Sequence, residues 1–315
     1  MIEVKGISKT YANGTRALKG VSFRLDKKIT SIIGQNGAGK TTLLRILSTQ
    51  LLPTSGTARI NNYNVVSDSS AVRENTVSIP QEIKPLDWFS AMDLVRIYLG
   101  ARGMDTRRAR ASAERALKKV GLWESRNKLS VELSGGMKRK IFVAMALGSD
   151  ADVVFLDEPT TGLDPVSRIQ IWGAIKAMRG QVVVTTHYME EADLLCDRLA
   201  IIDHGKIVAL DTPADLKKKI GGDVVRLKVA KPNLPRLRRL KYVKKIKSED
   251  GHIVLTVSSA DRHLQEILNA AGEVENVESR SPTLNDVFLH FTGTDIRDTE
   301  AEGGWFERSM NTRGR

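Results

Sequence analysis

The 315-residue chain contains one cysteine, Cys196, and no long apolar run. A single thiol excludes an internal disulfide and suits a reducing compartment, and we interpret Cys196 as a small, partly buried residue rather than a catalytic one. No segment approaches the roughly 18 apolar residues that a membrane-spanning helix requires. The N-terminus also lacks the apolar core of a signal peptide. We therefore expect a chain that is soluble by itself.

The length predicts two domains, because 315 residues exceed what one hydrophobic core usually organises. Through about residue 220, apolar runs alternate with helix-like segments, which predicts an α/β domain with a parallel sheet. An arginine-rich stretch with helical periodicity, from about 90 to 150, is interpreted as a helical insertion in this domain. The predicted strands are Ile29–Ile33, Thr76–Ile79, Val153–Leu156, Val182–Thr185 and Leu199–Ile202.

A second, smaller pattern occupies residues 222–292. Its predicted order is strand, helix, strand, strand, helix, strand, with the sequence Ser248-Glu249-Asp250-Gly251 as a turn between the two middle strands. That order is typical of a ferredoxin-like α+β domain. From Gly293 the chain becomes polar and rich in glycine, so residues 293–315 are expected to form a mobile tail. The sequence contains no internal repeat.

Residues 34–42, called the phosphate loop below, match the pattern G-x-x-x-x-G-K-[ST]. In this pattern glycines let backbone N–H groups surround a phosphate, and the lysine reaches the β- and γ-phosphate oxygens. A strand precedes the loop and an apolar helix follows it, which a chance glycine-rich turn does not explain. We predict that a nucleoside triphosphate binds to Gly34, Gln35, Asn36, Gly37, Ala38, Gly39, Lys40, Thr41 and Thr42, with Thr41 also offering its hydroxyl to Mg²⁺.

A pair of acids follows another predicted strand. Val153–Leu156 is a continuous apolar run, as expected for a strand buried on both faces, and Asp157-Glu158-Pro159 comes next. Because successive strand residues point in opposite directions, we expect one acid to face Mg²⁺ and the other to face the attacking water. Asp157 is our metal-binding acid and Glu158 our general base. Pro159 suits the end of a strand, since it cannot donate to a sheet.

The segment Leu133-Ser134-Gly135-Gly136-Met137 is the most discriminating motif. A serine hydroxyl and two glycine amides at the start of a helix form an anion site. With the phosphate loop and the Asp-Glu pair in this order, the chain resembles the ATP-binding cassette (ABC) ATPases. The resemblance covers about residues 1–220. It implies a head-to-tail homodimer on ATP binding, in which Ser134, Gly135 and Gly136 contact the ATP held by the other subunit.

The resemblance assigns roles to further residues, although each taken singly has an ordinary structural explanation. It implies that Tyr11 stacks on adenine, that Asp164 lies at the dimer seam and that His187 contacts the γ-phosphate. It also implies that Gln81 contacts Mg²⁺ and signals the nucleotide state to a membrane partner. The expected catalytic residues are Glu158, His187, Gln81 and Lys40, and the expected Mg²⁺ ligands are Thr41, Gln81 and Asp157.

One departure from the common signature points to a branch of the family. The glutamine that usually ends the signature is replaced by Met137, followed by the basic residues 138–140. This ending resembles the ABC-2, daunorubicin-resistance-like exporters, as do the residues around His187 and the segment Asn285-Asp286-Val287-Phe288-Leu289. Loss of the glutamine affects only contacts specific to that side chain, because Ser134 and the glycine amides remain.

Positive charge is concentrated in one window. Of the net charge of +12, residues 217–250 contribute +10, with 13 Lys or Arg and three acids. Such a window fits nucleic acid, an anionic membrane surface, an acidic partner, a dimer contact or a merely solvated face. Among these we favour a solvated face near anionic lipid.

Together these features predict an ATPase subunit of an ABC transporter, peripheral on the cytoplasmic face of the membrane, that drives export of drug, lipid or similar cargo through a separate permease. One alternative is a soluble ABC ATPase acting on nucleic acid or ribosomes. Against it, the chain has one phosphate loop and no sustained heptads. A second alternative, an importer subunit, differs only in its membrane partner. The sequence does not identify the cargo.

Overall fold

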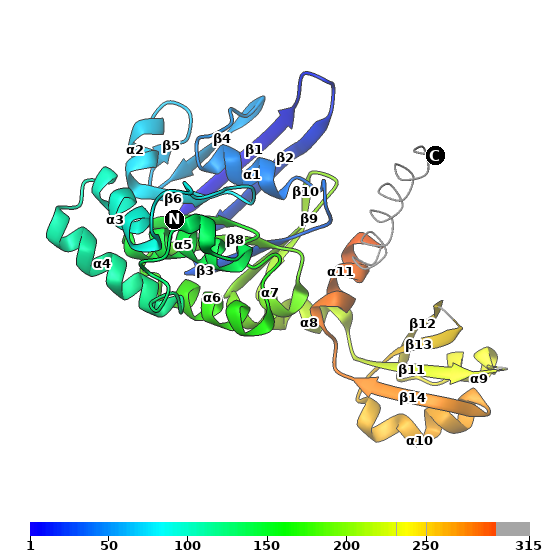
Figure 1. Ribbon diagram of the computed structural model, residues 1–315. Coiled ribbons are helices and arrows are strands. Elements are labelled where there is room, and N and C mark those ends of the chain that lie inside the picture. Colours follow the sequence, from blue (N-terminus) through cyan, green and yellow to red (C-terminus); the bar gives the residue numbers. More distant parts are fainter. Residues whose placement is uncertain (231, 250, 294–315) are drawn as a thin grey trace, which may run out of the picture. The chain divides into compact units, whose positions relative to one another are not determined.

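The computed structural model describes residues 1–230, 232–249 and 251–293 (Figure 1). The chain divides into two compact units, one formed by Met1–Leu210 and the other beginning at Asp211, rather than at about residue 220. The tail expected at 293–315 lies outside the described residues apart from Gly293. No helix in the described ranges is long and apolar enough to cross a membrane.

A six-stranded sheet forms the centre of the first unit. Its order is β10-β9-β3-β8-β7-β6, and the five strands from β9 to β6 pair in parallel. Every residue of β3 and β7 is buried, which explains the continuous apolar run at Val153–Leu156, whereas β3 also buries Thr30 and Ser31. The five predicted strands agree with the observed ones to within one residue at each end: β3 Ile29–Ile33, β6 Thr76–Ile79, β7 Val153–Asp157, β8 Gln181–Thr186 and β9 Arg198–Asp203, with β10 at Lys206–Asp211.

A second sheet in this unit was not predicted. It is antiparallel, in the order β2-β1-β4-β5, and its strands are β1 Ile2–Thr10, β2 Arg16–Leu25, β4 Ser55–Ile60 and β5 Tyr63–Asn64. Its apolar residues share one core with α1 (Lys40–Leu47) and with one face of the parallel sheet, as Phe23, Leu43 and Phe155 illustrate. This sheet therefore covers the helix that follows the phosphate loop.

The predicted helical insertion is present. Its helices are α3 (Ala91–Ala101), α4 (Thr106–Lys119) and α5 (Gly135–Gly148), with a short 3-10 turn at Ser130–Glu132. The side chain of the residue before each helix accepts a hydrogen bond from a backbone N–H in its first turn. The acceptors are Ser90, Asp105 and Ser134, and the N–H groups belong to Asp93, Arg108 and Met137, respectively. The remaining helices of this unit are α2 (Ser69–Asn75), α6 (Pro165–Ala177) and α7 (Met189–Leu195).

The second unit has the predicted ferredoxin-like order of elements. Its four antiparallel strands are arranged β12-β13-β11-β14, and one sheet face packs on two helices around Leu227, Leu255 and Ile267. Because side chains alternate along a strand, the other face carries a separate set of residues. The elements are α8 Pro213–Ile220, β11 Asp223–Val229, α9 Leu234–Arg238, β12 Val243–Glu249, β13 His252–Val257, α10 Ala260–Ala271, β14 Val274–Arg280 and α11 Leu284–Thr292.

The segment Asn285–Leu289 lies in α11, which packs against α8. Val287 and Phe288 are buried, whereas Asp286 pairs with Arg280 on β14 at 2.5 and 3.0 Å and accepts the N–H of Thr283. The exporter-like motif therefore holds the last helix in place within this unit.

Cys196 is half-buried, and its Sγ lies 2.8 Å from the carbonyl oxygen of Ala192. Burial raises the pKa of this thiol to about 11. A thiol with such a pKa is a poor nucleophile, which agrees with a structural role.

Candidate active site

Most of the predicted site residues follow four neighbouring strands of the parallel sheet. The phosphate loop follows β3, His187 follows β8, Asp157 and Glu158 lie at the end of β7, and Gln81 follows β6. The carboxyl ends of parallel strands lie at one edge of a sheet, so these side chains are brought together although they are far apart in sequence.

The phosphate loop leads directly into α1. Gly39 is the N-cap of the helix and has a φ of 110°, a conformation that a side chain disfavours. A Cβ atom there would also lie 2.7 Å from the carbonyl oxygen of Ala17, so the loop can pass this close only with glycine. The first N–H groups of a helix have no partner within the helix, so the start of α1 offers an anion site at the end of the loop.

Lys40 is the first residue of α1 and is 5% exposed. Its Nζ donates to the carbonyl oxygens of Gly34 (2.7 Å) and Gln35 (3.1 Å). Burial lowers the pKa of the Lys40 ammonium, although the negative charges of Glu158 and Asp157 oppose this effect. The lysine is thus held across the loop, close to both acids.

Glu158 is the point on which the other side chains converge. Its Oε1 lies 3.8 Å from the Nζ of Lys40, and its Oε2 lies 3.3 Å from the Nδ1 of His187. Gln81 and Thr161 each donate to the same Oε2 at 3.1 Å. Burial tends to raise the pKa of the Glu158 carboxyl, but the hydrogen bond and charge of His187, with Lys40 and Thr161, hold it below its ordinary value. The group is therefore ionised at neutral pH.

We expected strand alternation to turn Asp157 and Glu158 in opposite directions, and this explanation is wrong for Glu158. Strand alternation does not orient Glu158, because β7 ends at Asp157 and Glu158 has a φ of 48°, in the left-handed region. The N–H of Glu158 instead donates to the carbonyl and hydroxyl oxygens of Thr185 at 3.2 and 3.0 Å. A neighbouring strand thus holds this strained residue in place.

Asp157 is 4% exposed, and its Oδ1 accepts a 2.5 Å hydrogen bond from the hydroxyl of Thr185. The expected Mg²⁺ ligands, Thr41, Gln81 and Asp157, offer only oxygen donors, which are the donors that Mg²⁺ prefers. Gln81 uses its amide nitrogen toward Glu158, which leaves its amide oxygen as an acceptor. The donor set therefore suits the ion. No group of three or more His, Cys, Asp or Glu that could hold a metal occurs among the described residues.

Arg139, on α5, was not predicted as a site residue. Its guanidinium donates to five backbone carbonyl oxygens. Two of them follow β6, and three lie at the end of β7 and just beyond it, so Arg139 joins these two segments. The oxygens belong to Pro80 (3.2 Å), Gln81 (2.7 Å), Asp157 (2.7 Å), Glu158 (2.7 Å) and Pro159 (3.4 Å). The only sequence signal was the basic run after Met137, which we had interpreted as a mark of the branch.

Glu191, on α7, was also missed. It is 1% exposed and accepts from the hydroxyls of Thr160 (2.7 Å) and Thr186 (2.8 Å), with Arg168 at 3.5 Å. These contacts join the segments on either side of His187 to the loop after β7. Both hydroxyls donate to the Oε2 of this buried carboxylate, whereas its Oε1 makes no hydrogen bond among the described residues and lies 3.5 Å from the Nε of Arg168.

Other predicted residues lie apart from this centre. The Oη of Tyr11 lies 3.1 Å from the Oγ1 of Thr42, beside the phosphate loop. Ser134 is the N-cap of α5, and Asp164 is the N-cap of α6, where it accepts the N–H of Ser167 at 2.9 Å. Hydrogen bonds from the side chain and the backbone of Ser167 lower the pKa of the Asp164 carboxyl. In the described part of the chain, no hydrogen bond joins Ser134 to the phosphate loop.

Comparison with known proteins agrees with this geometry. The family described as "ABC transporter" matches residues 18–161, and the family "ATP-binding protein DrrA1-3-like, C-terminal domain" matches residues 212–292. Daunorubicin resistance ATP-binding protein DrrA3 of Streptomyces coeruleorubidus is 34% identical over 95% of this chain and 98% of its own length. This chain is an ABC transporter ATP-binding protein.

Two further comparisons extend the assignment. Linearmycin resistance ATP-binding protein LnrL of Bacillus subtilis (strain 168) is 31% identical over 95% of this chain and its own full length. The dimeric post-hydrolysis structure of the ATP-binding cassette MJ0796, bound to ADP and Pi, matches with a TM-score of 0.62 and 26% identity, covering 67% of this chain and 98% of that one. This ABC protein is accordingly an ATPase with the cassette fold.

Proposed function

We propose that this ABC ATPase powers export of a drug-like or lipid-like compound through a separately encoded membrane permease. The observation that carries the hydrolytic part is the convergence of Lys40, Gln81 and His187 on Glu158. The support for export is the full-length similarity to proteins named for daunorubicin and linearmycin resistance. The DrrA-like second unit, shared with the daunorubicin group, adds to it.

We assign each residue a role in hydrolysis from its position. The phosphate loop and Lys40 bind the β- and γ-phosphates. Glu158, kept ionised by its neighbours, accepts a proton from the attacking water and orients it. His187 and Gln81 lie against the same carboxylate and therefore at the γ-phosphate end of the site. When bound by Thr41, Gln81 and Asp157, Mg²⁺ neutralises charge on the β- and γ-oxygens.

The remaining assignments concern the adenine base and the second subunit. Tyr11 lies beside Thr42 at the end of the loop, which supports our assignment of its ring to stacking on adenine. Ser134, Gly135 and Gly136 begin α5 and make no hydrogen bond to the phosphate loop of their own chain within the described ranges. We therefore assign them to the ATP of a second subunit in a homodimer, with Asp164 at the seam.

We place this subunit at the cytoplasmic face of the membrane, bound to its permease. Purification of the tagged full chain in mild detergent from its own cells tests this proposal. The expected result is a stoichiometric partner with several membrane-spanning segments, and ATP hydrolysis that responds to the exported compound. Salt-sensitive copurification of nucleic acid without a membrane protein would contradict the proposal and favour the soluble alternative.

A further inference from the structure

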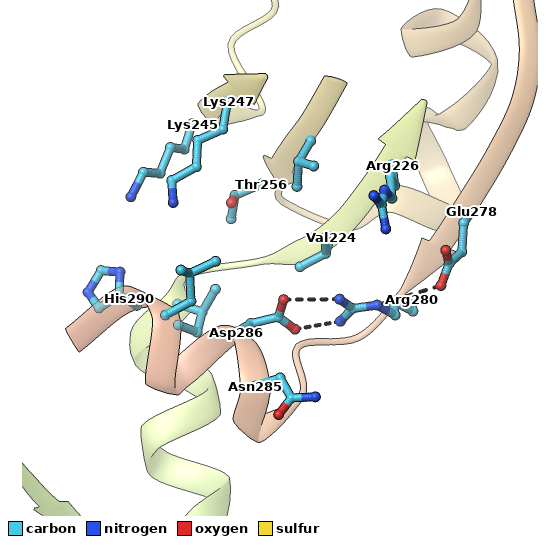
Figure 2. Close-up of a pocket in the computed structure, with 13 residues that line it drawn as sticks. Val224, Arg226, Lys245, Lys247, Thr256, Glu278, Arg280, Asn285, Asp286 and His290 are labelled. Carbon is cyan, nitrogen blue, oxygen red and sulfur yellow. Dashed lines mark hydrogen bonds and ion pairs between the residues drawn. The ribbon is translucent and has the colours of Figure 1, made fainter. Parts of the chain in front are cut away.

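A pocket of about 380 Å³ lies in the second unit, on the sheet face opposite the apolar core (Figure 2). Its wall is made by alternate residues of all four strands and is completed by α11 and the end of α8. A volume of this size is typical of sites for small ligands. The lining residues are Ile220, Val224, Arg226, Lys245, Lys247, Val254, Thr256, Glu278, Arg280, Asn285, Asp286, Leu289 and His290.

Cationic side chains outnumber anionic ones in this pocket. Four lysines or arginines line it, against the two carboxylates of Glu278 and Asp286. Both oxygens of Asp286 are engaged by Arg280, and hydrogen bonds from Arg280 and Thr283 hold the pKa of Asp286 below its ordinary value although burial acts to raise it. Arg280 and Asp286 therefore neutralise each other within the fold. The remaining charge is positive.

Two of these cations have no partner. Within the described residues, neither Arg226 nor Lys245 forms a hydrogen bond or an ion pair, and the Nε of Arg226 is buried. Glu278 stands opposite Arg226 in the register of β11 and β14, yet its ion pair is with Arg280 at 3.7 Å. A buried donor without an acceptor is costly, so a ligand that accepts from it is favoured.

The arrangement of the cations suits a single anionic group. Figure 2 shows Lys245 and Lys247 extending from β12 toward the same space, with Arg226 on the opposite side of the pocket. Such a set of donors matches a tetrahedral anion with several acceptor oxygens. Val224, Val254 and other apolar residues line the same wall and offer contact for a carbon chain.

We propose that this pocket binds a small phosphate ester, with Lys245, Lys247 and Arg226 on the phosphate oxygens and the apolar residues against the adjoining carbon atoms. The site is separate from the phosphate loop and does not depend on the function proposed above. A phosphate ester reaches such a pocket from two sources, a soluble metabolite or the headgroup of a phospholipid. The chemistry of the contact is the same in both.

Titration calorimetry with glycerol 3-phosphate tests the site directly. The full chain is first saturated with Mg²⁺ and a nonhydrolysable ATP analogue, so that the phosphate loop is occupied. We expect binding to the wild type and about tenfold or more weaker binding to K245Q/K247Q, because each lost charged hydrogen bond weakens affinity substantially. R226Q is the second variant, used in the same way if the double variant does not fold. The control is R238Q/R239Q, which removes two exposed cations from the same basic window but outside the pocket.

Sedimentation with vesicles distinguishes the sources. The same proteins are mixed with vesicles of phosphatidylcholine containing or lacking phosphatidylglycerol. Loss of phosphatidylglycerol-dependent binding in K245Q/K247Q but not in R238Q/R239Q supports the headgroup as the ligand. Binding of glycerol 3-phosphate without any such difference supports a soluble ester. Equal behaviour of the pocket and control variants in both assays overturns the proposal and leaves only the general basicity of the window.

Discussion

The Nε2 of Gln81 donates a 3.1 Å hydrogen bond to the Oε2 of Glu158, so the segments after β6 and β7 meet at one carboxylate. The same oxygen lies 3.3 Å from His187, which follows β8. A change in the position of any of these segments therefore changes the surroundings of Glu158. This shared contact gives a physical route by which the loop after β6 and hydrolysis influence each other.

Glu158→Gln tests the catalytic assignment, since it keeps the size of the side chain but removes its basicity. We expect ATP hydrolysis to fall by about 100-fold or more, because general bases contribute this much or more. ATP binding should remain, and a dimer should accumulate with ATP bound. Steady-state hydrolysis and size-exclusion chromatography with ATP and Mg²⁺ are the measurements. Hydrolysis at the wild-type rate would show that Glu158 is not the base.

Arg139→Met tests whether the five carbonyl contacts position the active site. The hydrogen bonds that Arg139 makes to described residues all lie outside the phosphate loop, so we expect ATP affinity to stay within about twofold. We expect kcat to fall about tenfold or more, because strong charged hydrogen bonds to the end of β7 are lost. Arg139→Lys keeps the charge but not the planar fork, and it should recover only part of the rate.

Lys138→Met is the matched control for Arg139, because it removes a neighbouring cation from the same helix that makes none of these contacts. Its kcat should stay near that of the wild type. An equal loss in the two variants would mean that net charge on α5, rather than the contacts of Arg139, controls the rate. A loss of ATP affinity without a change in kcat in Arg139→Met would likewise reject a positioning role.

The phosphate loop and the Asp-Glu pair could be predicted because each is a contiguous segment whose strand is buried on both faces. The contacts of Thr185, Arg139 and Glu191 could not, since their partners are brought together only by sheet order and helix packing. The basic run that contains Arg139 indicated only a branch of the family, and Thr185 lies within an ordinary strand.

The antiparallel sheet of the first unit was missed for another reason. The pairing of β1 with β2 contains register shifts between Val4 and Ile7 and between Ile7 and Thr10. Such irregularities interrupt the alternation of apolar and polar residues on which strand prediction depends. In the second unit, by contrast, β13 alternates regularly between buried and partly exposed residues.

Glu191→Ala tests the buried network beside His187. Removal of the carboxylate leaves the hydroxyls of Thr160 and Thr186 without their acceptor in a buried place and takes away the anionic neighbour of Arg168, so we expect a loss of about 3 kcal/mol in the free energy of unfolding. Urea unfolding measures the change. Glu190→Ala removes an exposed neighbour on the same helix and should cost less than about 0.5 kcal/mol. Similar losses in both variants would contradict the role of the network.

Asp286→Asn tests the ion pair that holds α11. The test uses pH, because the ion pair exists only while Asp286 is ionised. The pKa of Asp286 is lower in the folded chain than its unfolded value of about 3.9. The stabilisation is therefore fully present above about pH 4 and is lost as pH falls through the folded pKa. Because the side chain of Arg280 is 37% exposed, solvent weakens the pair, and we expect about 1–2 kcal/mol at neutral pH.

Hydrogen exchange of the peptide 284–292, compared between Asp286→Asn and the wild type at each pH, measures this difference without the intrinsic pH dependence of exchange. At pH 7 the variant should exchange about 5- to 30-fold faster, and the two proteins should converge as pH falls below about 4. Glu278→Gln is the control, because that carboxylate is 61% exposed and lies 3.7 Å from Arg280, so its removal should leave exchange in α11 nearly unchanged. A ratio that stays constant down to pH 3 would show that the charge of Asp286 does not hold the helix, and that its loss acts only through the capping hydrogen bond to Thr283.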